Sequence, residues 1–344
     1  MHQIKEVTGF CNWKSAELNH DQSWKYRLTK DDIKELDIAL KHLKSCEIDS
    51  FLFSKNYFPL PNLSKKLSEI SDYLENNRGI FLLRGFPVEQ YSQNDIALMY
   101  AGLGAHLGVA LRNSIEGELI YNVMDRGKSL TDKGSRGTAT KDPLPFHTDR
   151  CDVVALLCLK KAKKGGESRV VSAVAIHNEI LRRRPELLAE LYRPYYHART
   201  AWETGEENSY YPLPIFNIHQ GHFAFRYLRH FINVAQSIPS VPTMTNQQID
   251  ALNLLESIAN SSEFCADMEF EVGDIQLLNN FVSLHSRSGY EDHEDPSLKR
   301  LLLRLWLAVP NSRPLSDAFL PLFHSVEAGA VRGGVPAAMK KNTL

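Results

Sequence analysis

The chain has 344 residues, of which 43% are hydrophobic and 24% are charged, and its formal net charge is -1. These values are typical of a globular protein, and the balanced charge excludes a general attraction to nucleic acid or to an anionic membrane. No run approaches the roughly 20 apolar residues that cross a bilayer, and the N-terminus lacks the apolar region of a secretory signal.

Five cysteines are scattered along the chain without a CxxC pair, and their number is odd. Such a pattern favours reduced thiols over a disulfide framework. We therefore expect a cytoplasmic protein that has no membrane or nucleic-acid partner. The sequence does not indicate an oligomeric state.

The first part of the chain, residues 1–115, shows both helical and strand patterns. Apolar residues at helical spacing, preceded by capping residues, predict helices over 30–46, 63–77 and 92–108. Between the second and third of these helices, the apolar run "GIFLLRGFP" is bounded by glycine and proline and predicts a buried strand.

Strand patterns dominate residues 116–310. Short apolar or alternating runs separated by turn residues predict a β-sandwich or barrel rather than a parallel sheet. The expected strands lie at 117–125, 153–159, 168–176, 212–228 (two strands around the turn "HQGH"), 267–287 (two strands) and 298–310. Helices are expected over 176–192 and 245–261, and a tail rich in small residues follows at 311–344.

One short motif in the stretch "PLPFHTDRCD" carries potential metal ligands, His147 and Asp149. On a strand, residues two apart point to the same side, so the imidazole and the carboxylate can converge on one divalent ion. A bare HxD motif is common, and a role at a strand edge or in capping is the plain alternative.

A third ligand would complete a metal site, and His285 in "FVSLHSR" is the best candidate. It ends a strand pattern, and basic strand residues that can bind a dicarboxylate follow it. With His2 at the N-terminus set aside, ten other histidines compete, but His106 and His177 lie in helical patterns, and His219, His222 and His293 lie in turns or loops. Two histidines and one carboxylate form the facial triad of non-haem Fe(II) oxygenases, which leaves three positions open.

Together these features resemble the taurine dioxygenase (TauD/TfdA-like) family of Fe(II)/2-oxoglutarate-dependent dioxygenases. The resemblance spans most of the chain and rests on the order and spacing of six pieces: "GIFLLRGFP", "GLGAHLG", "LPFHTD", "LLCLKKAKKGGES", "LLNNFVSLHSR" and "KRLLLRLWL". It implies a double-stranded β-helix, or distorted jelly roll, with flanking and inserted helices. Residues 1–344 are then expected to form a single catalytic domain.

The resemblance also implies a role for individual residues. His147, Asp149 and His285 match the metal ligands, and Arg304 matches the arginine that grips the far carboxylate of 2-oxoglutarate. Arg300 is its neighbour four residues earlier, and the hydroxyl of Ser168 matches a threonine that touches the same carboxylate. A planar guanidinium suits a carboxylate because it donates two parallel hydrogen bonds. Arg287 is a weaker competitor for this role.

The implied reaction uses Fe(II), 2-oxoglutarate and O2, and it hydroxylates an unactivated C–H bond while releasing succinate and CO2. The expected substrate is a small molecule such as an amino acid, another carboxylate or a natural-product intermediate. Asp149 argues against a halogenase, because family halogenases replace this carboxylate with a small residue. Desaturation, ring formation and oxidative cleavage remain open.

Candidates for substrate contact are Tyr121 and Asn122, on the strand before the HxD motif, and Arg229. We expect a strand across "HFAFRYLRHF" with Arg226 on one face and Arg229 on the other. A pocket arginine would suit a carboxylated or sulfonated substrate. The long, glycine-containing loop over 126–145 is expected to be a lid or to be disordered.

Two alternatives belong to other classes of protein. A non-catalytic β-helix protein could bind a metal or ligand, but it would not need both the metal triad and the arginine. A zinc hydrolase can also use histidine and aspartate ligands, but its chemistry does not require a downstream arginine. Formation of succinate from 2-oxoglutarate would exclude the first, and iron-dependent consumption of oxygen would exclude the second.

Overall fold

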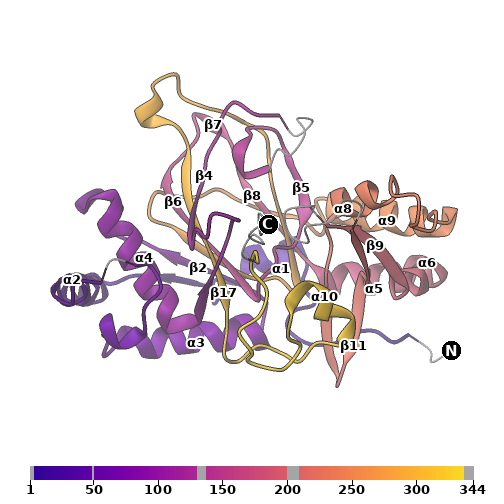
Figure 1. Ribbon diagram of the computed structural model, residues 1–344, viewed down its shortest axis with the longest axis horizontal. Helices are drawn as coiled ribbons and strands as arrows, with labels where there is room; N and C mark the ends of the chain where they lie inside the picture. Colours follow the sequence, from indigo (N-terminus) through magenta and orange to yellow (C-terminus); the bar gives the residue numbers. More distant parts are fainter. Residues whose placement is uncertain (1–3, 49, 130–136, 200–208, 337–344) are drawn as a thin grey trace, which may run out of the picture.

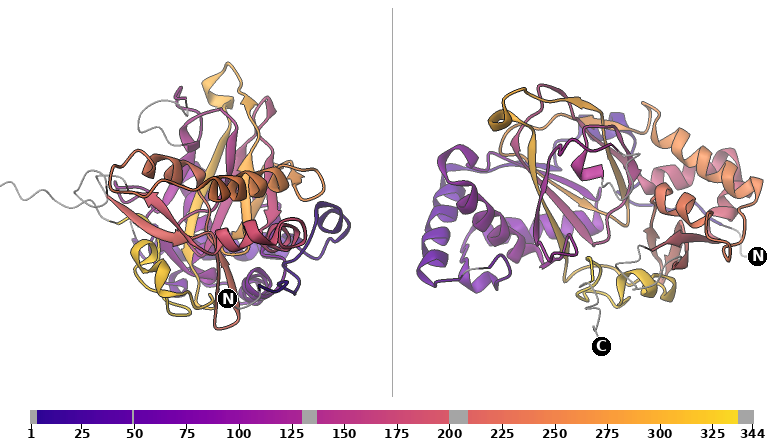
Figure 2. Two further views of the ribbon diagram at one scale, coloured as in Figure 1. Left: turned by 90° about the vertical axis from the view of Figure 1, so that its right-hand side faces the viewer. Right: turned by 45° about the horizontal axis from the view of Figure 1, so that its top comes forward.

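The computed structural model describes residues 4–48, 50–129, 137–199 and 209–336. Two β-sheets face each other in the middle of the molecule, and helices cover the outer side of each sheet (Figures 1 and 2). The chain therefore forms layers in the order helix, sheet, sheet, helix, and side chains from the inner faces of the two sheets pack together between them.

The larger sheet contains strands from both ends of the chain. Its order is β1-β2-β14-β6-β17-β3, and β4 also pairs with β17. The strands are β1 (Lys25–Arg27), β2 (Ile80–Arg84), β3 (Val109–Leu111), β4 (Ile120–Val123), β6 (Val153–Lys160), β14 (Ile275–Asn279) and β17 (Leu301–Ala308).

The smaller sheet has the order β13-β8-β15-β5. Its strands are β5 (Leu144–His147), β8 (Ser168–Ser172), β13 (Ala266–Met268) and β15 (Ser283–Arg287). Side chains that alternate along the strands point inward from both sheets, and Val154, Val170 and Trp306 belong to the apolar cluster that they form.

Three helices cover the outer face of the larger sheet: α2 (Lys30–Ser45), α3 (Leu63–Asn76) and α4 (Gln93–Leu107). Leu36, Leu67 and Met99, one from each helix, share a fully buried cluster with the outward side chains of β14 and β17. A capping box, in which the side chains of Thr29 and Asp32 bond each other's backbone amides, fixes the start of α2.

The smaller sheet is covered by α5 (Ala173–Arg183), α6 (Pro185–Leu191) and α9 (Asn246–Ala259), with α8 (Arg229–Ala235) beside them. Val171 and Leu284 on the sheet pack against apolar side chains of these helices. Two small pairs of strands complete this part: β9 (Pro194–Ala198) with β10 (Tyr210–Pro214), and β11 (Phe216–His219) with β12 (His222–Phe225). A third pair, β7 (Lys164–Gly165) with β16 (Tyr290–Glu291), lies away from these helices, at the top of the molecule in Figure 1.

The remaining elements are short. They are α1 (Ser15–His20), α10 (Leu320–Phe323), η1 (Lys55–Tyr57), η2 (Val88–Gln90), η3 (Gly137–Ala139), η4 (Pro296–Leu298) and η5 (Asp317–Phe319). After β17 the described part of the C-terminal tail, residues 309–336, runs along the lower edge of the molecule in Figure 1, drawn in yellow.

Most elements predicted from sequence agree with the structure, but several differ. The helix expected over 176–192 is two helices, α5 and α6, because Pro185 forces Arg184 out of helical geometry. The two strands expected over 212–228 are three (β10, β11 and β12), and so are the two expected over 267–287 (β13, β14 and β15). The expected strand over 168–176 ends at Ser172, because the Ser172 hydroxyl accepts a hydrogen bond from the amide of Ala175 and caps α5. The strand expected across "HFAFRYLRHF" ends at Phe225, and α8 begins at Arg229. The loop expected over 126–145 falls partly outside the described residues.

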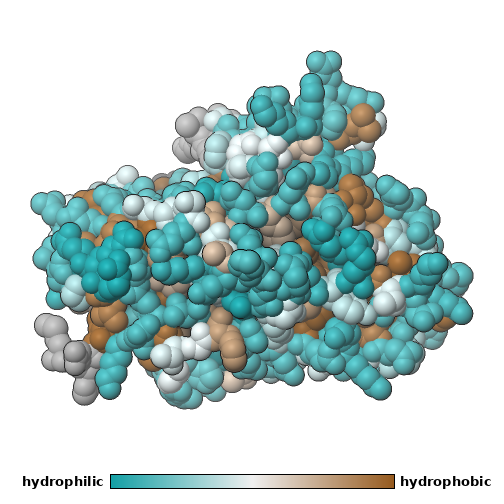
Figure 3. Space-filling model, turned by 180° about the vertical axis from the view of Figure 1, so that it is seen from behind, coloured by the Kyte–Doolittle hydropathy of each residue, from teal (hydrophilic) through white to brown (hydrophobic). Residues whose placement is uncertain are grey.

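The surface has the mixed hydropathy expected from the amino-acid composition. The face shown in Figure 3 is mostly hydrophilic, and its apolar side chains appear in separate patches.

Candidate active site

Three predicted ligands meet between the two sheets. His147 ends β5, and His285 lies opposite it on β15 in the strand register. Asp149 follows two residues after His147, beyond the end of the strand. One possible ligand atom from each side chain lies within 4.8 Å of the others, and the two imidazole rings are 4.3 Å apart between centroids. This spacing suits one metal ion held by three side chains.

Burial and neighbouring charges set the protonation of these ligands. Burial, followed by repulsion from His285, lowers the pKa of His147 to about 3, so its imidazole is neutral at physiological pH. Burial alone would raise the pKa of Asp149, but the charge of Arg304 and the two histidines hold it well below its usual range. A neutral imidazole and an ionised carboxylate are the forms that bind metal.

Backbone contacts orient two of the ligands. Nδ1 of His147 donates to the carbonyl of Pro145 at 2.9 Å, which leaves Nε2 free. The amide of Asp149 donates to Oδ1 of Asn280 at 2.8 Å. Within the described residues, Oδ2 of Asp149 is buried without a hydrogen-bond partner, and Nε2 of His285 lies 3.6 Å from it. A bound ion would satisfy this oxygen, so the three residues fit a divalent metal.

Arg304 lies at the metal end of the space between the sheets. Its Nη1 is 3.5 Å from Oδ1 of Asp149, and its Nε donates to Oδ1 of Asn113 at 3.0 Å. The guanidinium lies over the rings of Trp306 and Tyr121, at 4.5 and 5.5 Å from their centroids. These contacts hold a buried positive charge in one orientation beside the ligands.

Arg300 directly precedes β17, is buried, and has a different environment. It forms no ion pair within the described part of the chain, and its Nη1 has no hydrogen-bond partner there. Its Nη2 donates only a long bond of 3.4 Å to the carbonyl of Gly166. Burial, followed by repulsion from Arg287, lowers its pKa to about 10. A buried cation with a free donor is suited to an anionic ligand.

Arg287 and Arg300 both lie against the ring of Tyr290, at 4.9 and 5.1 Å from its centroid. Arg287 is held more firmly than Arg300, because its Nη2 donates to the carbonyls of both Thr140 at 2.8 Å and Asp142 at 2.5 Å. Arg287 therefore holds the end of the loop that precedes β5.

Ser168, the first residue of β8, is buried near the same end of the space. Its hydroxyl donates to Oε1 of Gln276 on β14 at 3.0 Å, and this bond joins the two sheets. A small cavity lies next to Arg300 and is lined by residues that include Cys158, Gly166 and Phe270.

Comparison with known proteins decides the family. The profile described as "Taurine catabolism dioxygenase TauD, TfdA family" matches residues 41–306. The chain belongs to this family. It is therefore an Fe(II)- and 2-oxoglutarate-dependent dioxygenase, and the cluster of two histidines and one aspartate is consistent with that chemistry.

Two relatives match most of this TauD-family chain. FR-33289 synthase of Streptomyces rubellomurinus is 33% identical over 313 residues, which cover 90% of this chain and 92% of that protein. The taurine hydroxylase-like protein SAT17 of Stachybotrys chartarum is 26% identical over 325 residues, which cover 88% and 81% of the two chains.

Solved structures with low identity share the fold. Asparagine oxygenase, in complex with Fe(II), a hydroxyasparagine and succinate, is 14% identical with a TM-score of 0.64 over 83% of this chain and 93% of that one. The non-haem iron oxygenase OrfP, in complex with Fe and α-ketoglutaric acid, is 17% identical with a TM-score of 0.62 over 82% and 93%. The predicted double-stranded β-helix is thereby confirmed.

The predicted substrate contacts of this TauD-family enzyme lie in different places. Tyr121 is buried on β4, opposite Arg304 in the strand register, and faces the space between the sheets. Asn122 is the next residue and points to the other face. Arg229 begins α8 and turns to α9, where it bonds Asn253 at 3.1 Å and lies 3.6 Å from Glu256.

Arg226 lies closer to the metal ligands than Arg229 does. Its Nη1 donates to both the carbonyl and the hydroxyl of Thr148, the residue between the two ligands of the HxD motif. The sequence offered no signal for this contact, because the partners are far apart in the chain. Asn280, which orients Asp149, was missed for the same reason.

All five cysteines of the chain are free thiols in the structure. Within the described residues, none of the helices has the length and apolar character needed to cross a membrane.

Proposed function

We propose that this dioxygenase hydroxylates an unactivated C–H bond of a small substrate that carries an anionic group. The observation that supports it most directly is the convergence of His147, Asp149 and His285 next to a buried, oriented arginine. Iron held by these residues would supply the activation of O2, and 2-oxoglutarate would supply the electrons for it. The protein's own contribution is to bind, orient and exclude water.

We propose that the far carboxylate of 2-oxoglutarate binds to Arg300, with Ser168 beside it. Arg300 is buried, has a free Nη1, and has no carboxylate partner within the described residues. Arg304, the first choice from the sequence, already faces Asp149 and Asn113 at the metal end. This difference supports Arg300 as the clamp and leaves Arg304 for an anion close to the metal.

We further propose that Arg304 faces the anionic group of the substrate and that Tyr121 lines the same pocket. The guanidinium between the rings of Trp306 and Tyr121 is screened from water, and a charge-assisted hydrogen bond is stronger in such a place. Asn122 points to the other face of β4, and the contacts of Arg229 with α9 support a structural role instead.

The remaining expectations from the sequence concern the domain organisation, the compartment and the partners, and they are proposals as well. We propose that the chain acts as a single catalytic domain in a reducing, cytoplasmic compartment, without nucleic-acid or membrane partners. The free thiols and the sharing of one sheet by strands from both ends of the chain support this view.

The test is a turnover screen with matched compounds. The protein is incubated with Fe(II), 2-oxoglutarate, O2 and small carboxylates or sulfonates, each paired with its neutral amide or ester. We expect at least one acid to stimulate succinate formation and to gain one oxygen atom by mass spectrometry. Loss of two hydrogens instead would indicate desaturation or ring closure. Equal turnover of the neutral partner would contradict an anionic substrate.

A further inference from the structure

A buried arginine in the C-terminal tail lies close to the metal-ligand segment. Arg332 is outside the residues that match the family profile, and its side chain is 0% exposed. Its Nε pairs with Oδ1 of Asp152 at 2.8 Å. Its other donors bond carbonyls of the tail itself, at Arg313 and Glu327. The guanidinium thus connects the tail to a carboxylate three residues after Asp149.

Asp152 is fixed from several sides. Its Oδ2 accepts a hydrogen bond from the amide of Val309 at 3.0 Å, and its own amide donates to the carbonyl of Leu307 at 3.1 Å. Its carbonyl accepts from the amide of Asn280 at 3.0 Å. Asn280 in turn accepts from the amide of Asp149. A short path therefore leads from Arg332 through Asp152 and Asn280 to the ligand.

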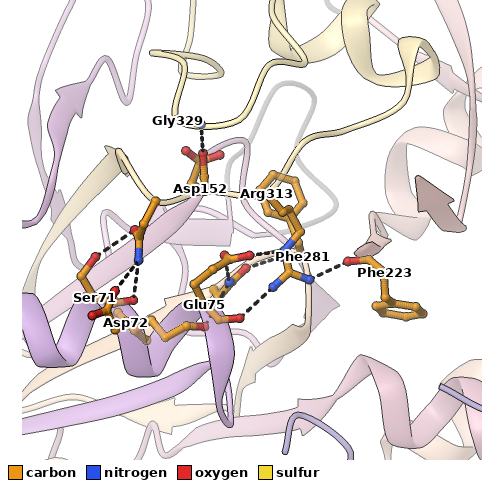
Figure 4. A network of polar contacts seen from close by, with 12 residues as sticks. Ser71, Asp72, Glu75, Asp152, Phe223, Phe281, Arg313 and Gly329 are labelled. Atoms are coloured by element: carbon orange, nitrogen blue, oxygen red, sulfur yellow. Dashed lines mark hydrogen bonds and ion pairs between the residues drawn. The ribbon is translucent and has the colours of Figure 1, made fainter. Parts of the chain in front are cut away.

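The same path reaches the strand of the third ligand. Asn280 lies in the turn between β14 and β15, and β15 carries His285. The neighbouring ring of Phe281 lies 5.2 Å from the Arg332 guanidinium. Figure 4 shows Asp152 and Phe281 beside Arg313, which bonds Glu75 and the carbonyl of Phe223.

The backbone of the tail also lies against the ligand segment. The amide of Gly334 donates to the carbonyl of Arg150 at 2.7 Å. At Gly333 a Cβ atom would lie 2.6 Å from the same carbonyl, so no larger residue fits without a shift. Contacts at both Arg150 and Asp152 show that the tail docks along this segment rather than at a single point.

We propose that Arg332 is a positioning residue for the metal site. By pairing with Asp152, it holds the segment 150–152 against the β14–β15 turn, and this sets Asp149 relative to His285. The inference rests on the proposed iron site. Removal of Arg332 would leave a buried carboxylate without its partner, and such a group moves or draws in water. The ligand geometry would then relax, although no ligand is changed.

The test compares Fe(II) affinity with the stability of the metal-free protein. Fe(II) is titrated anaerobically into full-length Arg332→Ala and Arg332→Lys, and the metal-free melting temperature is measured separately. We expect the Kd for Fe(II) to rise about tenfold in Arg332→Ala, the lower end of the effect seen when residues that support metal ligands are changed. Arg332→Lys keeps the charge and should recover part of this loss.

Asn311→Ala is the matched control. Asn311 also joins the tail to the body, through Ser71 and Asp72 of α3 (both labelled in Figure 4), and within the described residues its side chain forms no hydrogen bond with residues 147–152. We expect its Kd for Fe(II) to stay within about twofold of the wild type, even if its melting temperature falls. A higher Kd in Arg332→Ala than in Asn311→Ala would therefore distinguish displacement of the segment 150–152 from a general loosening of the tail.

A double variant tests the path itself. If Arg332 acts through Asp152, the combination of Arg332→Ala with Asp152→Asn should weaken Fe(II) binding no more than the stronger single variant. An unchanged Kd in Arg332→Ala with a lowered melting temperature would overturn the proposal, and so would additive effects in the double variant. If Arg332→Ala does not fold, Arg332→Lys is judged by the same Kd criterion. Failure of the wild type to bind Fe(II) would instead reject the proposed iron site.

Discussion

Nη1 of Arg304 lies 3.5 Å from Oδ1 of Asp149, a distance at which the charges attract each other without a short hydrogen bond. Arg300, four residues earlier, forms no ion pair within the described residues. Two buried arginines of one chain segment therefore have different surroundings. Arg304 faces a carboxylate of the metal-ligand cluster, and Arg300 has no carboxylate partner within the described residues.

Changing Arg300 should weaken the binding of 2-oxoglutarate most. Loss of a hydrogen bond to a charged group costs about 1.5–3 kcal/mol, so we expect Arg300→Ala to raise the Kd about 10- to 100-fold. The measurement is anaerobic calorimetry with the metal-loaded protein. Arg229→Ala, remote from this end, is the control. Equal affinities for 2-oxoglutarate in Arg300→Ala and the wild type would show that the clamp lies elsewhere.

Changing Arg304 should make metal binding more sensitive to acid. Arg304 lowers the pKa of Asp149 against the effect of burial. In Arg304→Gln this pKa rises, so protons compete with the metal at a higher pH. We expect Mn(II) binding, followed as the Kd from pH 7.5 downward, to be lost at a higher pH in Arg304→Gln than in the wild type. Loss at the same pH in both proteins would mean that Arg304 does not control the ionisation of Asp149.

The buried, neutral His197 should make the free energy of unfolding decrease as the pH falls. It is buried on β9, stacks on Tyr211 with centroids 5.3 Å apart, and burial, followed by the charge of Arg226, lowers its pKa to about 3. The unfolded chain takes up a proton near pH 6.5, well before the folded protein does, so the contribution is full above pH 6.5 and is lost as pH falls toward 3. Between pH 7.5 and 5 this amounts to about 2 kcal/mol.

The measurement for His197 is urea unfolding at the two pH values. His197→Phe keeps the stacking on Tyr211 but cannot be protonated, so its free energy of unfolding should fall by about 2 kcal/mol less than that of the wild type. A loss of equal size in both proteins would show that His197 is protonated in the folded state.

Arg229 should contribute to stability and not to catalysis. It bonds Asn233 and Asn253 and approaches Glu256, which joins α8 to α9. We expect Arg229→Ala to lower the free energy of unfolding by roughly 1–2 kcal/mol and to leave the substrate KM unchanged. A large rise in KM at unchanged stability would return Arg229 to the substrate pocket.

The sequence predicted those parts of the site that depend on short spacing. His147 and Asp149 lie two residues apart, and His285 ends a clear strand pattern, so local rules and the family resemblance both found them. The start of α2 was also predicted correctly, because Thr29 is a residue type that commonly caps helices. Such features depend on neighbours within one turn of a helix or one strand.

The other contacts around the site could not be predicted, because the residues that form them are far apart in the chain. Arg226 bonds Thr148, and Arg332 pairs with Asp152, and no local pattern links these residues. The roles of Arg300 and Arg304 depend on which already has a partner, which only the packed structure reveals. The start of α5 was missed because its first residues, after Ser172, are apolar and resemble a continued strand.

The most direct test is an anaerobic crystal structure of the protein with Fe(II) and 2-oxoglutarate, with the iron located by anomalous scattering. We predict one iron bound by His147, Asp149 and His285, with the far carboxylate of 2-oxoglutarate on Arg300. Iron at any other position, or a cosubstrate whose far carboxylate does not reach Arg300, would contradict the account.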